Sequence, residues 1–94
     1  MIVASLRLDL RLDGCFSLKE KRRVLRPLLE RARNHGLSAA EIADQDLWNA
    51  AGVGLATVSA DAREAEKALR AAEGFFDSCP MVEIVSEEYA IERR

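Results

Sequence analysis

The stretch Ile2-Val3-Ala4-Ser5-Leu6-Arg7-Leu8-Asp9-Leu10-Arg11-Leu12-Asp13 decides the fold, because its two sets of alternate residues differ in character. One set, from Ile2 to Leu12, is entirely apolar, whereas the other is mostly polar or charged. Successive side chains of a strand point to opposite faces of the sheet, so this alternation predicts a half-buried strand with one solvated face. Sheets built from such strands are covered by helices on one side and open on the other.

A helix is expected directly after this strand. Gly14 interrupts the alternation, and Ser17 with Glu20 three residues later forms a capping box. The apolar residues that follow repeat with the period of a helix and define one core-facing side. The helix should run to about His35, with Gly36 as its C-terminal cap.

The remaining elements follow in the order strand, strand, helix, strand. A polar connection, residues 44–51, separates the second and third strands, and Pro80 marks the exit from the second helix. The second helix opens with the Asp61–Glu64 capping box, and the tail is Glu92-Arg93-Arg94. The expected ranges are Leu37–Ala43, Val53–Ser59, Asp61–Phe76 and Met81–Ile91.

This order, βαββαβ, predicts a single α+β domain over residues 1–94. The arrangement that fits best is a ferredoxin-like sandwich, in which a four-stranded antiparallel sheet carries two helices on one face. The first and third strands should lie at the centre of that sheet. A different α+β packing of the same elements is the alternative.

The composition agrees with one folded domain, since 49% of the 94 residues are hydrophobic and 32% are charged. Cys15 and Cys79 do not form a disulfide framework and are expected to be reduced. The N-terminal residues lack the basic segment of a secretory signal, and no apolar run approaches the ~18 residues of a membrane helix. The sequence therefore predicts a cytoplasmic protein with no membrane partner.

Charge is sorted along the chain, although the net charge is only −2. Residues 1–33 hold nine basic and four acidic residues, a net +5, whereas residues 34–94 hold five basic and twelve acidic residues, a net −7. Such asymmetry indicates contact between the basic half and a polyanion.

The start of the first helix concentrates this positive charge. Cations here oppose the helix dipole by about 0.3–1 kcal/mol each, and like charges three or four residues apart repel by about 0.2–0.5 kcal/mol per pair. Folding alone would favour acidic residues, so a phosphate-contacting role competes with the simpler interpretation of a solvated helix face. The predicted nucleic-acid-binding residues are Lys19, Lys21, Arg22, Arg23 and Arg26.

The segments Ser17-Leu18-Lys19-Glu20-Lys21-Arg22, Ala40-Glu41-Ile42 and Gln45-Asp46-Leu47-Trp48 carry a family resemblance. Together with the length and element order, they resemble the YlxP-like family of small uncharacterised bacterial proteins. The resemblance implies a ferredoxin-like fold and a cytosolic setting near genes of translation initiation and ribosome maturation, with no established active site. The sequence departs from the family pattern at Pro27 and at Ala43.

Other chemistry-bearing residues are weaker candidates. Glu41, Asp44 and Asp46 match no defined metal loop, so no metal or cofactor is predicted. Cys15 lies near basic residues that would lower its pKa, but the only histidine, His35, is expected at the far end of the same helix. Trp48 is either a lid over the core or an interface residue.

These observations favour a non-enzymatic RNA- or ribosome-associated accessory protein that contacts structured RNA through its basic helix start. The alternative is a homodimeric structural or small-ligand regulatory module, which would pair through the edge of the second strand or through Trp48 and make no nucleic-acid contact.

Overall fold

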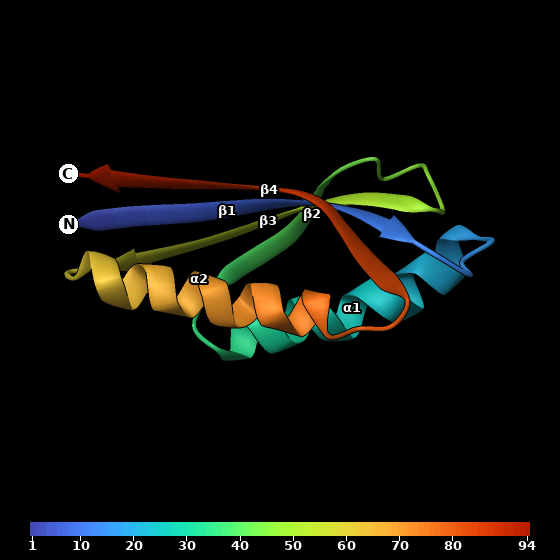
Figure 1. Ribbon diagram of the computed structural model, residues 1–94, viewed down its shortest axis with the longest axis horizontal. Helices are drawn as coiled ribbons and strands as arrows, with labels where there is room; N and C mark the ends of the chain where they lie inside the picture. Colours follow the sequence, from blue (N-terminus) through green and yellow to red (C-terminus); the bar gives the residue numbers. More distant parts are fainter.

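The computed structural model describes all 94 residues and confirms the predicted order of elements. Four strands, each antiparallel to its neighbours, form a single sheet ordered β2-β3-β1-β4, with β1 and β3 at the centre as predicted. Both helices cover one face, and the other face is open (Figure 1). The elements are β1 (Ile2–Leu12), α1 (Leu18–Asn34), β2 (Ser38–Ala43), β3 (Ala50–Ser59), α2 (Ala62–Asp77) and β4 (Val82–Arg93).

The core lies between the sheet and the helices. Every even-numbered residue of β1 is buried, which confirms the predicted alternation. The core-facing residues of α1 are Leu25, Leu29 and Ala32, and those of α2 include Leu69 and Phe76. Helix α1 opens at Ser17, whose hydroxyl accepts a hydrogen bond from the Glu20 amide, and Gly36 follows the helix with a positive φ of 84°.

Two strands are longer than the sequence predicts. Strand β3 begins at Ala50, three residues before the expected Val53, because Ala50 to Gly52 pair with the end of β1. Strand β4 continues to Arg93, so most of the expected tail is paired with the start of β1. The two terminal residues also exchange backbone hydrogen bonds. Pairing with a neighbouring strand thus overrides weak local propensity at both places.

Glycine at position 52 is required by the close approach of β2 and β3. A Cβ atom there would lie 2.7 Å from the Cβ of Ala43, and both atoms are fixed to the backbone. Gly74 is the opposite case, because it lies in α2 with open space around the position of a Cβ.

We therefore expect Gly52→Ala to lower the free energy of unfolding by about 1–3 kcal/mol through overpacking. Gly74→Ala should raise it by about 0.5–1 kcal/mol, because alanine favours the helix. Urea denaturation of both variants checks this pair. Equal effects of the same sign would contradict it.

Candidate functional site

A ridge of positive charge runs along the exposed side of α1. We define the basic ridge as Lys19, Arg22, Arg23 and Arg26, which together with Pro27 line a shallow depression of about 480 Å³. All four cations are exposed. Their side chains therefore converge on one hollow instead of spreading around the helix.

The basic ridge lacks acidic partners. No carboxylate oxygen lies within 4.0 Å of any of its four cationic groups, whereas Arg7, Arg11, Arg70 and Arg94 each pair with an acid. Because these neighbouring cations have no acidic partner, nothing compensates the repulsion between them. Binding of an anion would relieve it.

The amides at the start of α1 contribute less than the sequence suggested. The Ser17 side chain already takes the Glu20 amide, and the Glu20 carboxylate accepts the Phe16 amide at 3.0 Å. This carboxylate also places a negative charge at the helix start. The free positive charge of α1 therefore lies along the side of the helix, not at its end.

Lys21 is not part of this surface, which corrects its assignment as a phosphate-contacting residue. The side chain is only 1% exposed and is the one charged side chain in the core. Its Nζ donates to the carbonyl oxygens of Asp44, Leu47 and Ala50 at 2.8, 2.5 and 2.8 Å. It cannot reach a phosphate while these bonds hold.

Glu41 completes the environment of Lys21. Its Oε2 lies 2.7 Å from Nζ, and its side chain is 22% exposed. The ammonium group donates its three protons to the three carbonyls. Its contact with the Glu41 carboxylate is therefore electrostatic, and Oε2 receives no hydrogen bond. Lys21 thereby fastens the β2–β3 loop, residues 44–49, to the first turns of α1.

The loop that Lys21 holds presents Trp48 to solvent. Trp48 is 42% exposed and contacts Phe16, which is 74% exposed, with ring centroids 5.7 Å apart. Trp48 is not among the residues of the core or those packed against it, so it does not act as a lid over the core. Phe16 is not among the residues predicted from the sequence, although an aromatic residue directly before a helix cap is visible there.

Residues 3–89 match a family model described as "Protein of unknown function (DUF503)". A curated relative, "Uncharacterized protein YlxP" of Bacillus subtilis (strain 168), is 43% identical over 68 residues, which cover 71% of this chain and 74% of the relative. The chain belongs to the DUF503 family. The predicted resemblance to YlxP-like proteins is thereby confirmed.

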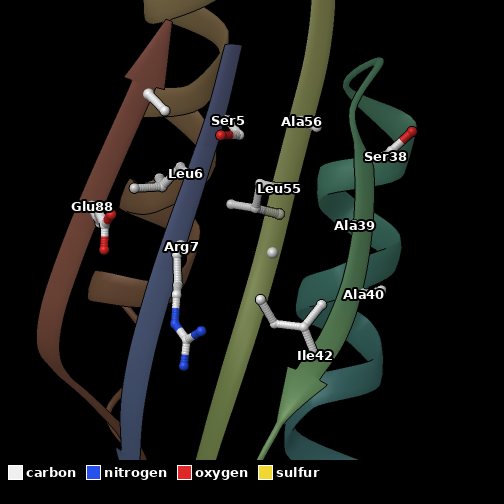
Figure 2. Close-up of a pocket in the computed structure, with 12 residues that line it drawn as sticks. Ser5, Leu6, Arg7, Ser38, Ala39, Ala40, Ile42, Leu55, Ala56 and Glu88 are labelled. Atoms are coloured by element: carbon white, nitrogen blue, oxygen red, sulfur yellow. The ribbon is translucent and has the colours of Figure 1, made fainter. Parts of the chain in front are cut away.

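This DUF503 protein has a second hollow, on the open face of its sheet, with a volume of about 520 Å³. Figure 2 shows its floor of small residues from β1, β2 and β3, with Ile42 lying over the floor beside Arg7. Arg7 is paired with Asp9 at 3.2 Å. The face presents no aromatic side chain, as the sequence of β1 predicts.

The weaker candidates are not gathered into sites. No group of three metal-ligating side chains lies together, and Glu41 faces Lys21 instead of Asp44 and Asp46. Cys15 is buried, and burial raises the pKa of its thiol, with a smaller contribution from Glu20. The expectation that nearby cations lower this pKa is therefore wrong, because burial outweighs Lys21.

The edge of β2 is partly covered. The Arg33 guanidinium donates to the Ala39 carbonyl at 2.7 and 3.0 Å, so one group of this edge strand is already satisfied. Covered edges resist pairing with another chain. This contact disfavours dimerisation through β2. No helix is long and apolar enough to span a membrane.

Replacing Lys21 tests the fastening of the loop. Lys21→Met should lower the free energy of unfolding by about 3 kcal/mol, because it leaves a partly buried carboxylate and three carbonyls without their partner. Lys19→Met, an exposed change of the same chemistry, should alter it by less than about 0.5 kcal/mol. Denaturant unfolding measures both, and Trp48 fluorescence reports the loop directly. Similar stabilities of the two variants would contradict the role of Lys21.

Thiol labelling tests the burial of Cys15. In a Cys79→Ser variant, iodoacetamide should label Cys15 only as fast as the protein opens. Cys79 is partly exposed, so it should react faster when it is labelled in a Cys15→Ser variant. The raised native pKa also means that the unfolded thiol ionises first, so stability should fall as the pH rises above about 9. Rapid native labelling of Cys15 would refute its burial.

Proposed function

We propose that this protein is a non-enzymatic RNA- or ribosome-associated accessory protein of the bacterial cytoplasm that contacts the phosphate backbone of structured RNA through its basic ridge. The observation that carries the proposal is the convergence of four unpaired cations on one hollow of α1. Lysine and arginine side chains that neutralise phosphates supply most of the affinity for nucleic acid, and each such contact releases counterions.

The proposed mode of RNA recognition follows from the lack of aromatic side chains on the outward face of β1. RNA-binding sheets stack bases on aromatic residues of their open face. Here the outward residues of β1 are Val3, Ser5, Arg7, Asp9 and Arg11. Contact through backbone and shape along α1 therefore fits better than base stacking on the sheet.

The non-enzymatic part of the proposal rests on the thiol and the histidine. Cys15 precedes α1 and is buried, whereas His35 follows α1, and its Nδ1 lies 2.9 Å from the Arg31 carbonyl oxygen. The two side chains stand at opposite ends of a helix of 17 residues, about 25 Å long at 1.5 Å per residue. A thiol with a raised pKa and no adjacent base is a poor nucleophile.

The alternative, a small-ligand or homodimeric module, would use the hollow of the open sheet face. Its volume of about 520 Å³ falls within the range of ligand pockets. Its convergent polar groups are few, and Arg7 is already committed to Asp9. The basic ridge gathers four cations without acidic partners around one hollow, so the RNA proposal takes precedence.

Charge reversal tests the proposal. The variant Arg22→Glu, Arg23→Glu, Arg26→Glu should lose nearly all affinity for structured ribosomal RNA. The slope of its remaining log affinity against log salt concentration should be smaller by the contribution of about three phosphate contacts. Filter binding or anisotropy across a salt series measures both, and circular dichroism verifies folding.

The matched control reverses three exposed cations away from α1, in the variant Arg63→Glu, Lys67→Glu, Arg93→Glu. It changes the net charge equally and should retain most of the affinity. Equal losses in both variants would show a general charge effect, and unchanged affinity in the first variant would refute the proposed surface. Sedimentation of the wild type tests the dimer of the alternative.

A further inference from the structure

Two of the most exposed aromatic side chains of the protein lie against each other at the start of the basic ridge. Phe16 comes from the β1–α1 connection and Trp48 from the β2–β3 loop, which meet at one end of the molecule (Figure 1). Their rings are tilted by 36°. Burial of a phenylalanine stabilises a fold by about 1.5–3 kcal/mol, so folding gains little from leaving Phe16 exposed.

Consecutive residues of α1 hold both aromatic residues in place. Glu20 accepts the backbone amide of Phe16, and Lys21 binds the carbonyls of Leu47 and Ala50 on either side of Trp48. The exposed rings therefore stand on pinned backbone and lose little freedom when they are covered. Rigid aromatic side chains of this kind are typical of surfaces prepared for binding.

The basic ridge begins beside this pair. Phe16 directly precedes the helix cap Ser17, and Lys19 lies in the first turn of α1. From Lys19 to Arg26 the ridge extends about 10 Å along the helix at 1.5 Å per residue. A strand whose phosphates follow the ridge toward Lys19 runs toward the helix end that carries Phe16.

We propose that Phe16 and Trp48 form a stacking platform for an unpaired base of the RNA whose phosphates lie on the basic ridge. This inference rests on the proposed function. Aromatic rings next to a row of cations match the chemistry of a single-stranded nucleotide, since the ring receives the base and the cations receive the phosphates. A protein partner with an ordinary surface would have to cover four unpaired cations, which disfavours it.

The platform is tested with two matched RNA probes, a hairpin that carries a four-nucleotide uridine overhang and the same hairpin with abasic nucleotides in the overhang. Trp48 is the only tryptophan, so its fluorescence reports the platform directly. The uridine probe should quench Trp48 and bind about 5- to 150-fold more tightly than the abasic probe, the range expected for one stacked base.

Variants of Phe16 separate the aromatic ring from simple apolar contact. Phe16→Leu should lower affinity for the uridine probe and leave affinity for the abasic probe unchanged. Phe16→Tyr should restore binding, because it retains the ring. Val58→Ala, a change at an exposed apolar residue of β3 away from α1, is the matched control and should have no effect on either probe.

The outcomes distinguish the two proposals. Equal, salt-dependent binding of both probes with no change in Trp48 fluorescence would overturn the platform and leave the basic ridge supported. Failure of the protein to bind either probe or ribosomal RNA would overturn both proposals. A change in sedimentation with Phe16→Leu, without a change in RNA affinity, would identify the pair as a self-association surface and also overturn the platform.

Discussion

The buried ammonium of Lys21 is the interaction on which the placement of the β2–β3 loop against the start of α1 depends. It joins two carbonyls of the β2–β3 loop, the Ala50 carbonyl at the start of β3 and the Glu41 carboxylate to the start of α1. Without a cation at this position, three backbone acceptors and a carboxylate would crowd together with no partner, a costly arrangement in a low-dielectric site. One side chain therefore determines where the loop and its tryptophan lie.

This arrangement divides the cations of α1 into two groups with opposite roles. Lys21 contributes to folding from inside the protein, whereas the basic ridge lies on the exposed side without acidic partners. Several acidic side chains pair with cations outside the ridge, among them Asp9, Glu66 and Glu83, which pair with other arginines. Such a distribution leaves a local positive surface on a protein whose net charge is −2.

The aromatic pair depends on the same fastening. Phe16 and Trp48 are 32 positions apart in the sequence and belong to different connections, and they meet because Glu20 and Lys21 hold those two connections to adjacent positions of one helix. The sheet face, in contrast, offers small residues and paired charges. Chemistry suited to a nucleotide is therefore concentrated at one end of α1.

The sequence by itself determined the fold, because the strict alternation of β1 and the two capping signals depend only on local backbone geometry and on which side chains avoid water. It also located the basic ridge through helical periodicity. The same periodicity places Lys21 about 40° from Leu25, on the apolar side, which was a signal of burial that the cluster of charges obscured. Only the tertiary structure decided that Lys21 is buried, that Cys15 is protected, and that Phe16 meets Trp48. Each of these depends on how two segments distant in sequence approach one another. The carbonyls of the β2–β3 loop become hydrogen-bond partners of Lys21 only after β2 and β3 have paired.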